Sequence, residues 1–113
     1  MDARLPKSER LCGKTAVAAL FEHGKSFQAG CLRCRCLLRG DAEPVRIVIS
    51  VPKRSFKRAV KRNLLKRRIR ESYRRQKGLL SGGADLLFIY TSREVLPYET
   101  IYADMTAALE GVR

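Results

Sequence analysis

Residues 57–75 form the stretch KRAVKRNLLKRRIRESYRR, and the order of residues within it decides the fold. At about 100° per residue on a helix, Leu65, Ile69 and Tyr73 are successive neighbours and form an apolar stripe. The stripe predicts a helix over about 57–77 that packs on a sheet through this face. Basic residues occupy both sides of the packed face and remain in solvent.

The two ends of this helix are indicated by different signals. Glycines end it, because Gly78 follows the basic stretch and the pair Gly82 and Gly83 comes soon after. At the other end, Val60 and Leu64 do not fit the apolar stripe. Either they contact another element, or the helix begins later than residue 57.

Shorter periodic segments on both sides of the basic helix predict the other elements. They are a helix at 14–23, strands at 31–39, 45–51 and 84–91, a hairpin turn at 40–44, and a final helix from Pro97 on. The final helix has one apolar face, formed by Ile101, Met105, Ala108 and Leu109. A strand on each side of the basic helix implies that the helix crosses over one sheet. We expect a single domain over 1–113, with 1–10 as a flexible arm.

The expected strands differ in how they distribute their side chains. Residues 31–39 alternate, as a half-buried strand does. The side chains expected toward the core are Leu32, Cys34, Cys36 and Leu38, and those expected outward are Arg33 and Arg35. Residues 45–51 are apolar on both faces, which is typical of a central strand.

The net charge of +13 is concentrated in one quarter of the chain. Residues 53–77 hold thirteen of the twenty-four Lys and Arg residues and a single acid, Glu71, so they supply +12 of the total. Like charges held this close repel one another, and a polyanion relieves that repulsion. Arg outnumbers Lys in the segment, which favours forked hydrogen bonds to phosphate, and Asn63 adds a donor and an acceptor. The partner is expected to be a nucleic acid.

RNA is a better match than DNA for this helix. A helix-turn-helix reader of DNA needs a short helix and a tight turn directly before the recognition helix. Here a predicted strand and Pro52 come first. A folded RNA accepts a rigid basic helix through phosphate and shape contacts.

The residues needed for nuclease chemistry by the protein alone are missing from the pattern. His23 is the only histidine, Asp41 and Glu43 lie in a predicted turn, and Asp85 is expected to cap a turn. We therefore predict no catalytic residue and no metal site in the protein.

The cysteines allow one weak alternative to a protein without metal. Cys12 and His23 could in principle complete a zinc site with the CLRCRC segment at 31–36. Strand alternation already explains Cys34 and Cys36 as core thiols, and their spacing does not suit an orderly disulfide framework. Reduced thiols, the absence of any run of about 18 apolar residues and the lack of a secretory signal predict a cytoplasmic protein.

Residues 51–74, VPKRSFKRAVKRNLLKRRIRESYR, resemble the signature of the bacterial ribonuclease P protein subunit. In that family an AV-x-RN-x-x-KR-x-x-RE-x-x-R core forms the RNR helix. The residues matching it without a gap are Ala59, Val60, Arg62, Asn63, Lys66, Arg67, Arg70, Glu71 and Arg74. Further likeness lies in RLPK at 4–7, LFEHGKSF at 20–27 and ADLLFIYT at 84–91. The resemblance implies an α+β fold, a small α/β sandwich with one mainly antiparallel sheet and a left-handed crossover through the basic helix.

The resemblance also implies a function. The family's protein is a subunit of the endoribonuclease ribonuclease P, which removes the 5′ leader of precursor tRNA. Catalysis belongs to the RNA subunit and its magnesium ions, so the protein alone is expected to be inactive. The implied partners are ribonuclease P RNA and precursor tRNA, with no DNA and no membrane.

Site residues follow from the same resemblance. The residues expected to contact the catalytic RNA are Lys53, Arg54, Lys57, Arg58, Lys61, Arg62, Asn63, Lys66, Arg67, Arg70 and Arg74. Those expected to bind the leader, in a cleft between the first helix and the sheet, are Phe21, Phe27, Arg33 and Arg35. Val17 stands where many members have a second aromatic residue, so stacking on the leader would be weaker or supplied by Phe27 or Phe56.

Two other functional classes fit the composition. A ribosomal-type RNA binder could use the same basic helix without any effect on tRNA processing. A protein that binds anionic membranes would need bulky apolar residues exposed opposite the charge, whereas Leu65, Ile69 and Tyr73 are needed by the core.

Overall fold

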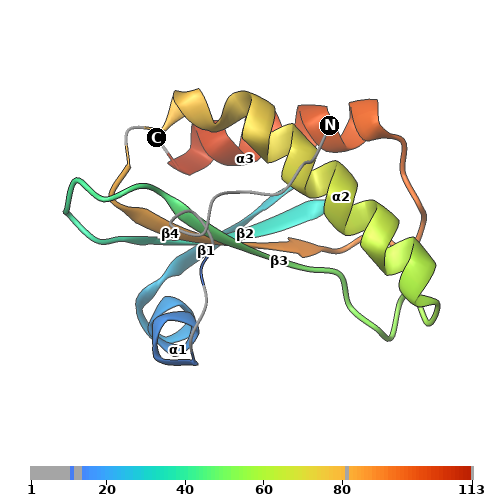
Figure 1. The fold of residues 1–113 in the computed structure, drawn as a ribbon, viewed down its shortest axis with the longest axis horizontal. Helices are drawn as coiled ribbons and strands as arrows, with labels where there is room; N and C mark the ends of the chain where they lie inside the picture. Colours follow the sequence, from blue (N-terminus) through green and yellow to red (C-terminus); the bar gives the residue numbers. More distant parts are fainter. Residues whose placement is uncertain (1–10, 12–13, 81, 113) are drawn as a thin grey trace.

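In the part of the chain that the structure describes, three helices cover a four-stranded sheet, two of them on one face and one on the other (Figure 1). The computed structural model describes residues 11, 14–80 and 82–112. The elements in chain order are α1 (Lys14–His23), β1 (Lys25–Ala29), β2 (Leu32–Leu38), β3 (Arg46–Ser50), α2 (Ala59–Gln76), the 3-10 turn η2 (Lys77–Leu79), β4 (Ala84–Tyr90) and α3 (Tyr98–Val112). The predicted arm at 1–10 lies outside the described residues.

The sheet has the order β1-β2-β4-β3, and all of its pairs are antiparallel except β3 with β4. This confirms the α+β class and the mainly antiparallel sheet. Because β3 and β4 are parallel, the chain between them must return to the same end of the sheet, and α2 makes this crossover. The left hand of the crossover stays a prediction.

Two expectations about the strands were wrong. Residues 40–44 do not form a hairpin turn, because β4 lies between β2 and β3 in the sheet. The hairpin instead joins β1 to β2 through Gly30 and Cys31, with Gly30 in the left-handed conformation at a φ of 57°. The segment 45–51 contributes an edge strand, and β4 is the central strand that is buried on both faces.

The strand β1 had no counterpart among the predicted elements. Its sequence KSFQA has few apolar residues, and its burial pattern is mostly exposed. Backbone pairing with β2 supports it, in the register Lys25 with Cys36 to Ala29 with Leu32. On β2, Leu32 and Cys34 are buried as expected, whereas Leu38 is 69% exposed.

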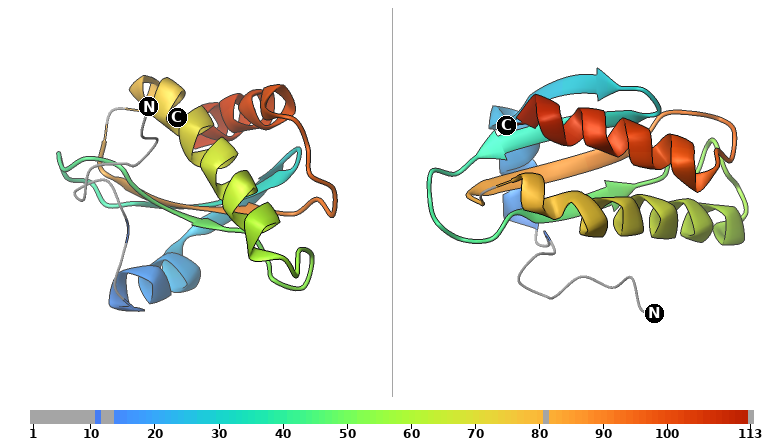
Figure 2. Two further views of the ribbon diagram at one scale, coloured as in Figure 1. Left: turned by 45° about the vertical axis from the view of Figure 1, so that its right-hand side comes forward. Right: turned by 90° about the horizontal axis from the view of Figure 1, so that it is seen from above.

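The apolar stripe of α2 packs on the sheet as predicted. Leu65, Ile69 and Tyr73 are each at most 1% exposed, and the Tyr73 ring lies 6.1 Å from that of Phe88 on β4. Beside α2, the helix α3 covers the same face of the sheet (Figure 2). Its buried residues are the four expected, Ile101, Met105, Ala108 and Leu109.

A smaller apolar cluster attaches α1 to the opposite face. Leu20 of α1 is fully buried and packs with Leu87 of β4 and Leu11. Partly buried residues around them, among them Val17, Leu37 and Ile89, extend this cluster. Burying both faces of β4 is what requires a helix on each side of the sheet.

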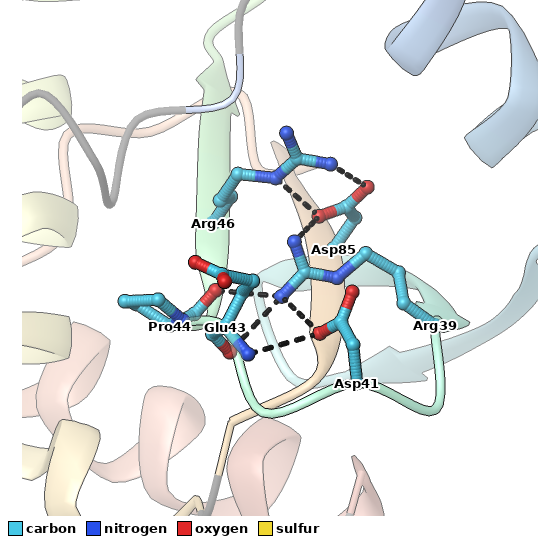
Figure 3. Close-up of polar contacts among 6 residues, drawn as sticks. All are labelled: Arg39, Asp41, Glu43, Pro44, Arg46 and Asp85. Carbon is cyan, nitrogen blue, oxygen red and sulfur yellow. Dashed lines mark hydrogen bonds and ion pairs between the residues drawn. The ribbon is translucent and has the colours of Figure 1, made fainter.

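A buried carboxylate holds the connection between β2 and β3 at the edge of the sheet (Figure 3). Asp85 is 2% exposed and accepts two hydrogen bonds from Arg46, at 2.9 and 2.8 Å. Arg39 approaches the same carboxylate at 3.4 Å and donates to the carbonyls of Glu43 and Pro44. The expectation that Asp85 caps a turn was wrong, because it lies inside β4 and joins three separate segments.

Candidate nucleic-acid interface

The solvent side of α2 gathers unpaired polar and basic side chains. Asn63 and Arg67 are exposed, and Lys66 and Arg70 are half-buried. None of these four has a hydrogen-bond or ion-pair partner in the described part of the chain. Because the opposite side of the helix is anchored in the core, the backbone that carries these groups is held in place and their side chains remain available to a ligand.

The start of α2 is stabilised in an unusual way. Its N-cap residue, Arg58, makes no side-chain cap hydrogen bond, and the first turn contains no acid. Arg62 donates instead to the carbonyl of Phe56 at 2.6 Å and to that of Lys57 at 2.9 Å. Arg62, a predicted RNA contact, therefore also shapes the loop that leads into the helix. The helix begins at Ala59, later than residue 57, but it still contains Val60 and Leu64, so the later start does not explain why these two residues lie outside the apolar stripe.

The loops beside the N-terminal end of α2 form a basic, shallow surface. Because β3 and β4 are parallel, the segments 51–58 and 91–97 leave the sheet at the same edge. A hollow of about 610 Å³ between them is lined by Arg54, Ser55, Thr91 and Arg93. A second, of about 520 Å³, is lined by Ser55, Phe56, Lys57, Arg58, Lys61, Arg93, Glu94 and Val95.

This surface contains one basic residue that the sequence reasoning missed. Arg93 lines both hollows, although it lies far along the chain from the basic stretch. The one feature of the sequence that could have indicated Arg93 is its place directly after the strand 84–91, since the loops that follow two parallel strands lie at the same end of a sheet. Phe56 joins the loop before α2 to the end of β4: it is 5% exposed and packs against Tyr90 with ring centres 5.8 Å apart and planes tilted by 51°, and so is not available to a nucleobase.

Glu71, the single acid of the basic stretch, organises the C-terminal half of α2. It accepts hydrogen bonds from Arg74 and from Arg75, the latter at 2.9 Å. These bonds, first that from Arg74 and then that from Arg75, lower the pKa of Glu71 from 4.5 to about 2, against the opposing effect of burial. Arg74, another predicted RNA contact, is therefore oriented by Glu71 within the helix.

The lowered pKa of Glu71 predicts a pH dependence of stability. A carboxyl group whose pKa is lower in the folded state adds stability above its unfolded pKa, and this contribution disappears as the pH falls toward the folded value. Wild type is thus expected to be more stable than Glu71→Gln at pH 7, with the difference shrinking between about pH 4.5 and pH 2. Thermal unfolding followed by circular dichroism over this range measures it. A difference that does not change with pH would contradict the assignment.

On the other face of the sheet, Arg35 joins β2 to the end of α1. Its guanidinium donates to the carbonyl of Leu20 at 3.0 Å and to that of Phe21, and lies 5.2 Å from the centre of the Phe21 ring. A cation at the C-terminal end of a helix also complements the helix dipole. Phe21 itself stays 50% exposed, so Arg35 holds an accessible aromatic ring in place.

Arg33 lies on the same face as this pair. It is exposed, and it faces Gln28 on β1 and Ile89 on β4 in the sheet register. Gln28 in turn donates to the hydroxyl of Thr91 at 2.8 Å, so the surface continues from α1 toward the hollow at Arg54. Three of the four predicted leader residues are therefore brought together.

The grouping of Phe27 with these residues was wrong. Phe27 pairs with Cys34, whose side chain belongs to the core under α2 and α3, and its ring packs against that core. A Cβ atom at Gly111 of α3 would lie 2.7 Å from the Phe27 ring. Phe27 thus lies on the opposite face of the sheet from Phe21. Adjacent residues of a strand point to opposite faces, so Ser26 and Gln28 point toward the face of α1 and Phe27 points toward α2 and α3.

The described thiols and acids do not form a metal centre. Burial raises the pKa of Cys31 and of Cys34 to about 12, and these thiols stay protonated. Both are free, as is the half-buried Cys36. Within the ranges that the structure describes, no three His, Cys, Asp or Glu side chains come together as possible metal ligands. Cys12, the fourth thiol of the zinc alternative, lies outside them, and His23 is exposed beside Glu22.

The length and the apolar character of the helices bear on whether one of them could cross a membrane. Over the described residues, no helix combines the length and the apolar character that crossing a bilayer requires.

Comparisons with known proteins agree with the fold and with the motif on α2. The family described as Ribonuclease P matches residues 5–113. A ribonuclease P protein component of Porphyromonas gingivalis is 35% identical over 114 residues, which cover 93% of this chain and 83% of the relative. That of Chlorobaculum tepidum is 38% identical over 82 residues, 68% of this chain and 53% of the relative.

Solved structures give the same result. The RNase P protein from Thermotoga maritima superposes with a TM-score of 0.81 at 26% identity, covering 93% of this chain and 98% of that one. The RNase P protein of Staphylococcus aureus has a TM-score of 0.82 over 95% of this chain and 97% of that one. At 21% identity, this second likeness supports the fold alone.

Proposed function

Because this chain belongs to the ribonuclease P protein family, we propose that it binds the catalytic RNA of ribonuclease P and the 5′ leader of precursor tRNA. In this role it assists the endonucleolytic removal of the leader, which produces the mature 5′ end of the tRNA. The observation that carries the proposal is the solvent side of α2, where Asn63, Arg67 and Arg70 are fixed by the buried stripe yet unpaired within the described residues.

The catalytic RNA is assigned to the surface formed by α2 and the loop before it. Arg67 and Arg70 present forked donors suited to phosphate oxygens, and Asn63 adds an amide between them. Lys53, Arg54, Lys57 and Arg58 are exposed on the preceding loop and extend the positive surface. A rigid helix is suited to this role, because little backbone entropy is left to lose on binding.

The leader is assigned to the opposite face of the sheet, beside α1. Phe21 offers an accessible ring for a base to stack on, and Arg33 offers a cation for the adjoining phosphate. Arg35 contributes indirectly, because its contacts with Leu20 and Phe21 hold the end of α1 and with it the Phe21 ring in place. The hollow lined by Arg54 and Arg93 continues this surface toward α2. A single-stranded RNA leader lying across the sheet would therefore approach the catalytic RNA.

The hydrolytic step is assigned to the RNA partner. The magnesium ions are assigned to the RNA partner, in keeping with the described part of the chain, where no three His, Cys, Asp or Glu side chains come together. The protein's own contribution is to hold leader and RNA together and to reduce the repulsion between their phosphates.

A cleavage assay at low magnesium tests the proposal. The protein is mixed with a bacterial ribonuclease P RNA transcript and a leader-bearing precursor tRNA, with RNA alone and protein alone as controls. We expect the leader to be released only when both are present. Tight binding to ribosomal RNA without any effect on cleavage would instead identify a ribosomal-type RNA binder.

A further inference from the structure

The outermost ridge of α2 is apolar in its N-terminal half. Val60 is 78% exposed and Leu64 is 37% exposed. They are one turn apart, so their side chains adjoin on the helix surface and form one patch, called here the Val60–Leu64 patch. At about 100° per residue the patch points away from Leu65 and Ile69, which face the core.

The packing of the described residues does not account for the exposure of Val60. No described residue covers Val60, and a β-branched residue at an exposed helical position is a weaker helix former than Ala. Neither side chain belongs to either apolar cluster of the fold. Val60 is therefore open to a partner from outside the described residues.

The surroundings of the patch restrict the occupant. Lys61 is exposed on one side of it, Asn63 on the other, and Arg67 is the next residue along the same ridge. The first turn of α2 contains no acid. An occupant must therefore be apolar where it meets Val60 and Leu64 and anionic around that point. A second copy of the chain would bring the same bases against these, and like charges would oppose the contact.

We propose that the Val60–Leu64 patch binds the flat face of an unpaired nucleobase of the RNA partner. An unpaired base has an apolar face and is flanked by two phosphates, so it matches an apolar patch set between bases. Lys61 and Arg67 hold the flanking phosphates, and the two aliphatic side chains bury the base. The inference rests on the proposed function, and it adds a contact that depends on an unpaired base to a helix that otherwise contacts phosphate.

The double substitution Val60→Ala with Leu64→Ala tests this contact. Ala is the stronger helix former, so the variant is expected to fold with unchanged or slightly raised thermal stability. Affinity for a bacterial ribonuclease P RNA transcript is expected to fall about fivefold to tenfold from the lost apolar burial. The dependence of affinity on salt should not change, because no charge is removed. Leu38→Ala, which removes an exposed leucine at the end of β2, is the matched control and should bind like wild type.

Chemical probing of the bound RNA supplies the second readout. With a reagent that modifies unpaired bases, wild type is expected to protect at least one base that the double variant leaves reactive. Equal affinity and equal protection by the two proteins would overturn the inference. So would sedimentation showing a wild-type dimer that the substitutions dissociate, because the patch would then join two copies. If wild type itself fails to bind the transcript, the proposed function fails instead.

Discussion

Replacing Arg67 and Arg70 together by Ala is expected to weaken binding to a ribonuclease P RNA transcript by about 150-fold or more, since two charge-assisted hydrogen bonds of about 1.5 to 3 kcal/mol each are lost. Both side chains lie on the solvent side of α2 and have no partner among the described residues. Their removal therefore costs the folded protein little, and the thermal unfolding temperature should stay near that of wild type.

The salt dependence of binding identifies the nature of the lost contacts. The slope of log affinity against log salt concentration should become shallower by about one unit for each phosphate contact removed. Arg67→Lys with Arg70→Lys is the matched control, because it keeps the charge and removes the forked geometry. That variant should retain the wild-type slope and lose only part of the affinity. Collapse of thermal stability with unchanged RNA affinity would mean that this face of α2 is misassigned.

The second large effect is on stability and concerns Asp85. Replacing Asp85 by Asn is expected to lower the free energy of unfolding by about 3 kcal/mol, because the attraction within a buried ion pair is lost while its cations stay partly desolvated. Here two cations, Arg39 and Arg46, would lose their shared carboxylate, and their side chains are only 14% and 34% exposed. For a domain of this size the melting temperature should fall by roughly 10 to 20 °C.

Asp41 provides the matched control for Asp85. It pairs with the same Arg39 at the same distance of 3.4 Å, but its side chain is 44% exposed. Asp41→Asn is therefore expected to cost less than about 1 kcal/mol. Urea unfolding of both variants measures the difference. Equal effects of the two substitutions would show that burial of Asp85 does not make the network important.

The elements predicted well are those whose signal is local. The spacing of Leu65, Ile69 and Tyr73 specified both the existence of α2 and its buried face, because a helix repeats every 3.6 residues whatever it packs against. The face of α3 followed in the same way. The family motif placed the exposed residues of α2 in register, so the main part of the candidate interface was predictable from residue order.

The elements predicted poorly depend on which strands become neighbours. Residues 40–44 looked like a hairpin turn because the strands beside them are consecutive, yet β4 inserts between those strands from about forty residues later in the chain. The apolar character of 45–51 suggested a central strand, whereas the segment forms an edge strand in which Ile47 is buried and the other residues of β3 are half-buried. Polar β1 is stabilised by backbone pairing, for which its side chains give no pattern.

The amino-acid order alone determined that a rigid basic helix is anchored by an apolar stripe and leaves its other side in solvent, and that this side binds RNA stays a prediction. Only the tertiary structure decided which residues that helix and the sheet hold in place: Arg62 on the loop before α2, Arg35 on the end of α1, Asp85 between two arginines, and Phe27 on the face away from Phe21. The physical reason is range, since helical periodicity acts over a few residues, whereas these contacts depend on how distant segments pair across the sheet.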